Sequence, residues 1–284
     1  MQSGAYSLPA NCCDSHVHVY GPFDRFPAMQ AGRFSAARET PVEALFDLWD
    51  AMGIGRGVIV HALGAGRDNA VTLDALKRYP QRLRGVALVD ADITDRRLDE
   101  LTDAGFRGVR INLLRQDGKA VSSGGMTLDD LLALAPRLAE RGWHAQLWVE
   151  TGDLMELAPT LETLPLTFVI DHMGRTMVDK GVDYAGFQDF CAKLQTGRYW
   201  CKLSGADRNT RQGKPYGDTA PFLKALVAAN PDRLVWGSDW PHVGHPAGAL
   251  PTEGDLLGLF LDCVPDDAVR RKILVDNPAA LYGF

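Results

Sequence analysis

The sequence predicts a distorted, single-domain (β/α)8 barrel (a TIM barrel) that spans residues 1–284. Eight short apolar or β-branched runs recur along the chain, and segments of helix length with apolar residues at helical spacing separate most of them. Strands that alternate with helices pair in parallel through right-handed crossovers, and eight such units favour a closed barrel over an open sheet. A doubly wound open sheet is the alternative, but no GxGxxG or GxxxxGK(S/T) loop follows a strand.

The predicted elements follow one another from the N-terminus, and cap and turn residues mark their ends. The strands are expected at residues 12–20, 57–62, 83–89, 106–113, 143–150, 166–172, 199–205 and 234–240. Thr127, followed three residues later by Asp130, predicts the start of a helix, and Gly105 and Gly142 stand where helices should end. A helical tail is expected over about residues 252–284.

The composition excludes several classes of protein. The chain is 46% hydrophobic and 23% charged, and its net charge of −6 with no basic run argues against a nucleic-acid surface. Its longest apolar stretches have the length of strands, so we expect no transmembrane helix, and its start lacks the features of a signal peptide. The five cysteines show no CxxC spacing, which predicts reduced thiols. We therefore expect a cytoplasmic protein that binds neither nucleic acid nor membrane.

Polar side chains stand at the ends of seven of the eight predicted strands, where barrels of this kind carry their active sites. His16 and His18 project from one side of the first strand, because side chains two residues apart share a face. The other strands end in a further set of polar or aromatic groups: His61, Arg110, Asn112, Trp148, Glu150, Asp171, His172, Ser204, Asp207, Arg208, Asp239 and His242. Taken singly, each has a structural explanation, such as a hydrogen-bonded histidine or an arginine in a salt bridge.

One combination among these groups predicts chemistry, and it consists of His16, His18, His172 and Asp239. Imidazoles and a carboxylate hold the divalent metal of many hydrolases, where the metal lowers the pKa of a bound water to near neutrality. Without a metal, Asp239 can take a proton from water while the histidines hydrogen-bond a carbonyl oxygen. The residues leave both alternatives open.

Four motifs resemble those of the amidohydrolase superfamily: HxH on the first strand, INLLR on the fourth, HMG after the sixth and GSDWPH at the end of the eighth. More narrowly, they resemble the branch that contains 2-pyrone-4,6-dicarboxylate lactonase and related lactone hydrolases. The similarity extends from Asp14 to Tyr282. It implies that the three histidines of the combination above face a lactone carbonyl or a metal, and that Asp239 is the general base and later the proton carrier.

The resemblance also implies residues that bind the substrate. Four arginines match or nearly match those that hold substrate carboxylates in the family, namely Arg110, Arg115, Arg175 and Arg208. Guanidinium groups suit this role because they form bidentate contacts with carboxylates, although each arginine could instead form a salt bridge within the protein. Further substrate contacts are expected at His61, Trp148 and His242. Local differences from the family at His61 and Trp148 leave the identity of the lactone open.

The number of metals follows from the fourth and fifth strands. Superfamily members with two metals use a bridging Lys or Glu on the fourth strand and a His on the fifth. In this chain the fourth strand ends with Arg110 and Asn112, and the fifth ends with Trp148 and Glu150. A binuclear site is therefore not expected. The resemblance covers relatives that use zinc and relatives that need no metal, so either one divalent metal, zinc foremost, or none is compatible with the sequence.

The expected function is a hydrolase that opens a small anionic lactone, such as 2-pyrone-4,6-dicarboxylate or a muconolactone-type acid, with water activated by Asp239. A metal-dependent decarboxylase is the alternative, because superfamily decarboxylases use a similar His and Asp set, although the lactonase-like motifs disfavour it. An inactive barrel that serves as a binding protein is disfavoured because the HxH pair, His172 and Asp239 are all present. The expected partner is a small anionic molecule, and a homo-oligomer is left open.

Overall fold

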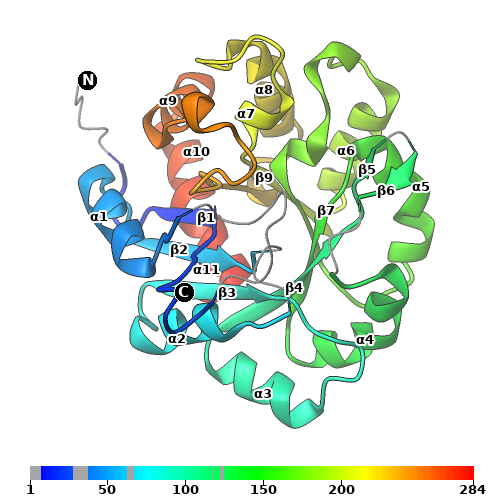
Figure 1. The fold of residues 1–284 in the computed structure, drawn as a ribbon. Coiled ribbons are helices and arrows are strands. Elements are labelled where there is room, and N and C mark those ends of the chain that lie inside the picture. The colour runs from blue at the N-terminus through cyan, green and yellow to red at the C-terminus, as the bar shows by residue number, and fades with distance from the viewer. Residues whose placement is uncertain (1–7, 28–37, 63–66, 117, 122–124) are drawn as a thin grey trace.

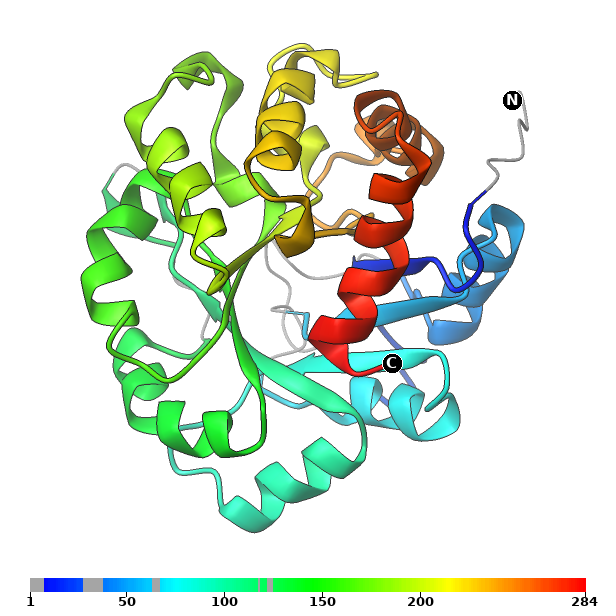
Figure 2. The same ribbon diagram turned by 180° about the vertical axis from the view of Figure 1, so that it is seen from behind.

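The computed structural model describes residues 8–27, 38–62, 67–116, 118–121 and 125–284. Its main sheet confirms the barrel, with eight parallel strands in the order β1 (Cys13–Val17), β2 (Arg56–Val60), β3 (Leu83–Ala87), β4 (Phe106–Asn112), β7 (His144–Trp148), β8 (Phe168–Ile170), β9 (Tyr199–Leu203) and β10 (Leu234–Trp236). A parallel bridge between Val17 and Trp240 joins the two ends of this sheet and closes the barrel. The strands surround the centre of the molecule and the helices lie outside them (Figures 1 and 2).

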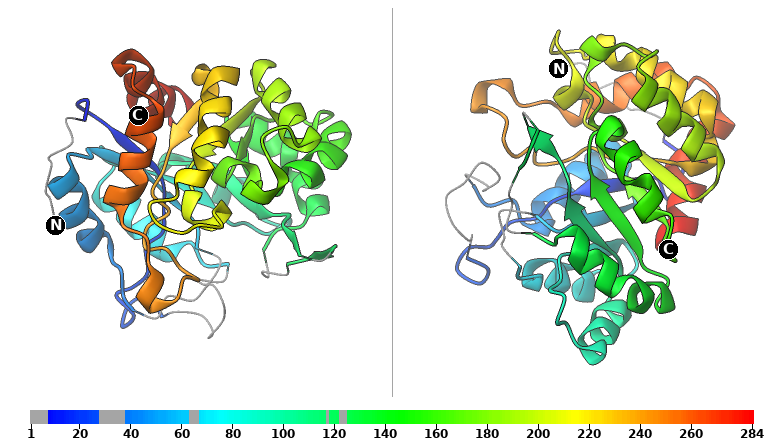
Figure 3. Two further views of the ribbon diagram at one scale, coloured as in Figure 1. Left: turned by 90° about the horizontal axis from the view of Figure 1, so that it is seen from above. Right: turned by 90° about the vertical axis from the view of Figure 1, so that its right-hand side faces the viewer.

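Helices connect the strands and form the tail, as predicted. They are α1 (Val42–Met52), α2 (Ala70–Arg78), α3 (Asp95–Asp103), α4 (Leu128–Glu140), α5 (Thr151–Leu161), α6 (Ala185–Gln195), α7 (Ala206–Asn209), α8 (Ala220–Ala229), α9 (Glu253–Cys263), α10 (Asp267–Arg271) and α11 (Asn277–Tyr282). Thr127 and Asp130 form the predicted capping box at the start of α4. The short hairpin of β5 (Arg115–Gln116) and β6 (Lys119–Ala120), absent from the sequence prediction, extends from the barrel (Figure 3). No helix in the described ranges is long and apolar enough to cross a membrane.

The interior of the barrel has an apolar core of its own, separate from the larger core between strands and helices. It is formed by Cys13, Val58, Val60, Val86, Val169, Trp200, Val235 and Tyr282. Most of these side chains come from the strands, whereas Tyr282 belongs to α11, which crosses the N-terminal end of the barrel (Figure 2). The tail therefore closes the bottom of the barrel and leaves the other end for the site.

Two predicted strands are shorter in the structure than expected, and the candidate site begins where they stop. The sixth strand was expected to reach residue 172 and the eighth residue 240, but β8 ends at Ile170 and β10 at Trp236. Beyond these ends His172 and Asp239 have φ angles of +55° and +64°. Such left-handed conformations are incompatible with a strand, so the chain turns at both positions.

The first strand is irregular at the point where it delivers its histidines. The pairing of β1 with β2 shifts register between Asp14 and Val17, as at a β-bulge, and His16 lies within this stretch. The Asp14 carboxylate accepts hydrogen bonds from the backbone N (2.9 Å) and hydroxyl (2.6 Å) of Ser238, which ties β1 to the segment after β10. A side chain at Gly237 would place its Cβ 2.7 Å from the His16 Cβ, so glycine is needed there.

Candidate active site

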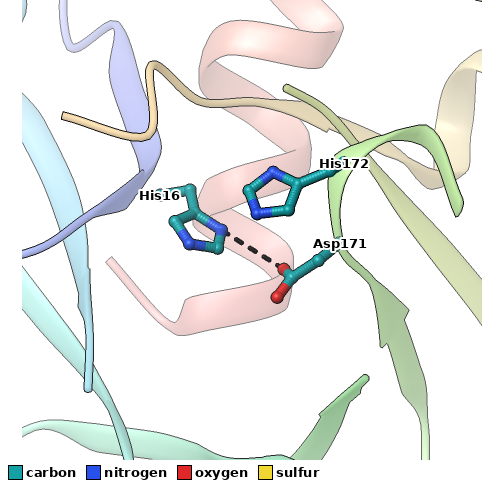
Figure 4. A group of neighbouring side chains, drawn as sticks. All are labelled: His16, Asp171 and His172. Atoms are coloured by element: carbon teal, nitrogen blue, oxygen red, sulfur yellow. Dashed lines mark ion pairs between the residues drawn. The ribbon is translucent and has the colours of Figure 1, made fainter. Parts of the chain in front are cut away.

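Five buried polar side chains converge at the C-terminal end of the barrel: His16, His18, Asp171, His172 and Asp239. The ring centroids of His16 and His172 are 4.7 Å apart, and those of His16 and His18 are 5.0 Å apart. Figure 4 shows His16, from β1, pointing towards Asp171 and His172, which follow β8. The structure thus brings together the four residues that the sequence singled out for chemistry and adds Asp171 to them.

Unusual backbone conformations position two of these residues. Non-glycine residues with positive φ cost about 1–3 kcal/mol each and cluster at functional sites. Both His172 and Asp239 are of this kind, and each lies just beyond the end of a strand. Gly205 accommodates the first of them, because a Cβ at Gly205 would lie 2.6 Å from the Cβ of His172. The turns that contain His172, Gly205 and Asp239 therefore direct the His172 and Asp239 side chains into the mouth of the barrel.

Asp239 is held as an ionised carboxylate. Its Oδ2 accepts a hydrogen bond from Nε of Arg208 at 2.6 Å and lies 2.6 Å from Nη2 of the same guanidinium, and its Oδ1 lies 3.2 Å from Nε2 of His18 and 3.5 Å from Nε2 of His16. Burial by itself raises the pKa of Asp239, but the charge of Arg208 and the neighbouring histidines outweigh it and hold the pKa well below its usual value. The carboxylate can therefore accept a proton during a reaction at neutral pH.

The hydrogen bond of His18 fixes which ring nitrogen carries its proton. Its Nδ1 lies 2.9 Å from the carbonyl oxygen of Val60, and a carbonyl can only accept, so Nδ1 is the donor. In a neutral His18 the lone pair of Nε2 then faces the Asp239 carboxylate. A proton or a cation between these two atoms makes that arrangement favourable.

His16 and His172 are neutral for the same main reason, which is burial. Burial, followed by the charge of Lys202, holds the pKa of His16 well below its usual value against the opposing effect of Asp171. Burial likewise lowers the pKa of His172 to about 4, although Asp239 and Asp171 oppose it. His172 Nδ1 lies 2.9 Å from the hydroxyl of Ser204, which can donate or accept, so this histidine can carry its proton on Nε2.

Asp171 belongs to a second layer of polar groups, whose role in the site the sequence does not predict. Its Oδ1 lies 3.2 Å from His16 Nδ1, and its Oδ2 accepts hydrogen bonds from Arg110 Nε at 3.2 Å and Gln146 Nε2 at 3.1 Å. Lys202 completes this layer, since its Nζ lies 2.7 Å from Gln146 Oε1. Gln146 and Lys202 lie within the buried strands β7 and β9. The one sequence signal for them is a polar residue inside an otherwise apolar run.

The ligand atoms fit one divalent metal ion. One atom each from His16, His18 and Asp239 can be chosen so that all lie within 4.8 Å of one another, and the buried Nε2 of His16 has no hydrogen-bond partner among the described residues. Two imidazoles and a carboxylate are a common set of metal ligands. A second group, His16, Asp171 and His172, also meets this distance, although Oδ2 of its carboxylate is already hydrogen-bonded by Arg110 and Gln146 and only Oδ1 is left for an ion.

A small inner pocket opens directly above these groups and leads towards a larger cavity. The inner pocket is lined by His18, Tyr20, Arg110, Trp148, His172, Arg208, Asp239 and Val243. The outer cavity of about 470 Å³ shares Trp148 and Arg208 with it and adds Arg115 and Arg175 among its lining residues. All four arginines expected to bind substrate thus face one of the two cavities, two at the reacting groups and two farther out.

The remaining expected substrate contacts differ in position. Trp148 lines both cavities and lies beneath the guanidinium of Arg110, whose Cζ is 5.3 Å from the ring centroid. His61 and His242 are buried near the same end of the barrel but do not line either cavity. His242 Nε2 instead lies 2.9 Å from Glu253 Oε1, which ties the loop after β10 to α9.

The fold and this arrangement define a hydrolase-type barrel, and comparison with known proteins gives its family. The amidohydrolase family model matches residues 13–284, so the chain belongs to the amidohydrolase family. It is 36% identical to the 2-pyrone-4,6-dicarboxylate hydrolase of Comamonas testosteroni, over 98% of this chain and 92% of that one. It is 35% identical to the 4-sulfomuconolactone hydrolase of Hydrogenophaga intermedia, over 98% of this chain and 90% of that one.

A solved structure agrees with both the fold and the branch of the family. It is a probable 2-pyrone-4,6-dicarboxylic acid hydrolase from Acinetobacter baumannii with citric acid bound, which is 29% identical to this chain. It superimposes with a TM-score of 0.82 and covers 96% of this chain and 100% of its own. The resemblance to the lactone-hydrolase branch, stated from the motifs, is confirmed.

Proposed function

We propose that this protein is a hydrolase that opens a small anionic lactone, such as 2-pyrone-4,6-dicarboxylate or a muconolactone-type acid. The observation that carries the proposal is the ionised Asp239 carboxylate, which faces the inner pocket beside two arginines and three histidines. A carboxylate among neutral imidazoles supplies a base, and the guanidinium groups supply binding sites for an anion. The relatives named above as lactone hydrolases support the same reaction.

Asp239 carries the proton through the reaction. It takes a proton from a water molecule as the water oxygen forms a bond to the lactone carbonyl carbon, which gives a tetrahedral intermediate with a negatively charged oxygen. The carbonyl then re-forms as the bond between this carbon and the ring oxygen breaks. Asp239 returns its proton to the departing ring oxygen, so the product is an open-chain hydroxy or enol acid and the carboxylate is restored.

His172 is the histidine best suited to stabilise the negative oxygen without first gaining a charge. Ser204 can donate its hydroxyl proton to Nδ1 of His172, which leaves an N–H on Nε2 beside the inner pocket. In a buried site, such a donor is worth far more than in water. His18 can donate from Nε2 only when it is doubly protonated, because its Nδ1 proton is committed to Val60.

The arginines that line the two cavities indicate that the substrate is anionic. Arg110 and Arg208 hold a carboxylate next to the reacting carbonyl, since both line the inner pocket. Arg115 and Arg175 lie in the outer cavity, where a second anionic arm of the substrate can reach them. His61 and His242 stay substrate contacts predicted from the sequence, although neither lines the two cavities. The cytoplasmic location also stays a prediction, and a homo-oligomer is left open.

A single divalent metal, zinc foremost, would be held by His16, His18 and Asp239, with His172 nearby. When bound, it would supply Lewis-acid polarisation of the carbonyl and a lower pKa for the attacking water. The contacts of the Asp171 layer do not depend on it, because they are made within the protein.

The proposal is tested with purified protein on 2-pyrone-4,6-dicarboxylate and on 4-sulfomuconolactone. Ring opening is followed by ultraviolet absorbance and carbon dioxide release is measured in parallel. We expect loss of the lactone without carbon dioxide, whereas carbon dioxide release without lactone opening would establish the decarboxylase alternative. Metal analysis, with turnover measured before and after chelation and after zinc is restored, then decides whether the reaction needs the ion.

A further inference from the structure

Lys202 is a fully buried lysine in the barrel interior that the proposed reaction does not use. It comes from β9, and its Nζ lies 2.8 Å from the carbonyl oxygen of Ser15, 2.7 Å from Gln146 Oε1 and 3.4 Å from His16 Nδ1. It is not among the side chains that line the inner pocket. Burying an ammonium group costs several kcal/mol unless good partners compensate. An apolar residue would fill this position at lower cost, so the partners of Lys202 call for an explanation.

These partners form a closed ring of four side chains. Lys202 donates to Gln146 Oε1, Gln146 Nε2 donates to Asp171 Oδ2 at 3.1 Å, and Asp171 Oδ1 lies 3.2 Å from His16 Nδ1. The ring closes between His16 Nδ1 and Lys202 Nζ. Its members come from β9, from β7, from the end of β8 and from β1, so the ring connects four strands across the barrel. Each member is fully buried.

The contact with Ser15 adds the backbone to this ring. Ser15 directly precedes His16 and lies in the stretch where β1 shifts register between Asp14 and Val17. Lys202 therefore donates a hydrogen bond to the carbonyl before His16, and its ammonium also lies beside Nδ1, the ring nitrogen that faces Asp171. The opposite edge of the ring, Nε2, faces Asp239 at 3.5 Å.

We propose that Lys202 is a positioning residue, which holds His16 with Nδ1 towards Asp171 and Nε2 towards Asp239 without itself touching the substrate. The proposal rests on the hydrolase function proposed above for the reaction it serves. A layer of this kind orients groups at a reaction centre in the way that outer hydrogen-bond partners orient metal-binding histidines, whose loss costs about 10- to 100-fold in activity or affinity. The alternative is a buried ion pair that serves stability alone.

The variant Lys202→Met tests this, because it keeps the length of the side chain and removes the ammonium. We expect kcat to fall about 10- to 100-fold while KM changes less than about threefold, since an interaction outside the substrate site acts on the transition state. Nitrogen-15 NMR of the histidine rings in the free protein gives a second readout, with the His16 signals assigned by a His16→Gln variant. We expect these signals to shift in Lys202→Met. The matched control is Trp200→Phe, on the same strand and in the apolar interior, which should leave kcat and the His16 signals unchanged.

A second variant covers the case in which Lys202→Met does not fold. Gln146→Met leaves the lysine in place and removes the hydrogen-bonded link through Gln146, while Lys202 Nζ still lies 3.8 Å from Asp171 Oδ1, so this variant should shift the same signals and lower kcat in the same direction but by less. In the double variant we expect no further loss beyond the larger single effect, because residues that act as one unit are not additive. The proposal is overturned if Lys202→Met folds and leaves both kcat and the His16 signals unchanged. If Lys202→Met does not fold, the same result in Gln146→Met overturns it. The NMR readout needs no substrate, so shifted His16 signals in a protein that opens no lactone would contradict the proposed function alone.

Discussion

The two ends of the barrel interior use the same eight strands for opposite purposes. At the N-terminal end the interior is apolar and closed by Tyr282 of α11. At the C-terminal end the same strands, and the turns that follow them, present ionised and hydrogen-bonded groups around Asp239. Between the two ends lies the layer of Gln146 and Lys202. The difference teaches that one end can be charged and strained because the other end supplies stability.

The sharpest test of this division is Asp239→Asn, which should change the reaction and not the fold. Removing the proton acceptor while keeping the shape of the side chain should lower kcat about 10³-fold, or about 4 kcal/mol in activation free energy. Steady-state turnover measures the change, and thermal unfolding checks the fold. The matched control, Asp232→Asn, removes an exposed carboxylate near the start of β10, at the other end of the barrel, and should leave kcat unchanged. An Asp239→Asn enzyme with wild-type kcat would show that another group is the base.

The complementary test is Tyr282→Ala, which should change the fold and not the reaction. The side chain is fully buried, so its truncation should lower the free energy of unfolding by about 3 kcal/mol through lost contacts and a cavity. The kcat of the folded protein should stay within about twofold of wild type because the residue touches no group of the site. Tyr282→Phe is the control: its hydroxyl has no hydrogen-bond partner among the described residues, so removing it should cost almost nothing. If Tyr282→Ala is fully folded and still loses much of its kcat, the two ends of the barrel interior are coupled.

His144 makes the N-terminal end sensitive to pH. Burial, with the charge of Lys202 second, lowers the pKa of this histidine from 6.5 to about 3 in the folded protein. Between these two pH values the unfolded chain binds a proton that the folded protein does not, so stability falls as the pH falls. Near pH 5 this residue alone should cost about 2 kcal/mol compared with pH 7.5.

The variant His144→Gln isolates this effect because it cannot gain the proton. Urea unfolding of both proteins at pH 7.5 and pH 5 gives the comparison. The substitution itself changes the free energy of unfolding at pH 7.5. Relative to that change, the variant should be about 2 kcal/mol more stable at pH 5 in comparison with the wild type. Equal losses of stability in the two proteins would mean that His144 is protonated in the folded state.

The sequence predicts those features of the barrel and the site that depend on residues close together along the chain. The strands, and the pair His16 and His18, were predicted because spacing along one strand is a local property. The roles of Gln146 and Lys202 were not, because a polar residue inside an apolar run gains meaning only when strands distant in sequence meet around the barrel. The early ends of β8 and β10 were missed for a related reason, since their residues favour strands but the site requires positive φ angles there.

The smallest expected effect lies at the rim, where a substrate contact competes with salt bridges inside the protein. The half-exposed Arg115 pairs with Asp153 at 3.2 Å and Glu156 at 3.1 Å, and it also lines the outer cavity. If it binds the far anionic arm of the substrate, Arg115→Ala should raise KM about fivefold, or about 1 kcal/mol, with kcat unchanged, because that contact is equal in the ground and transition states. The matched control is Arg96→Ala, which removes an exposed arginine paired with Glu100 on α3. An unchanged KM in Arg115→Ala would show that this arginine serves its two salt bridges alone, and the anion-binding part of the site would then end at Arg175.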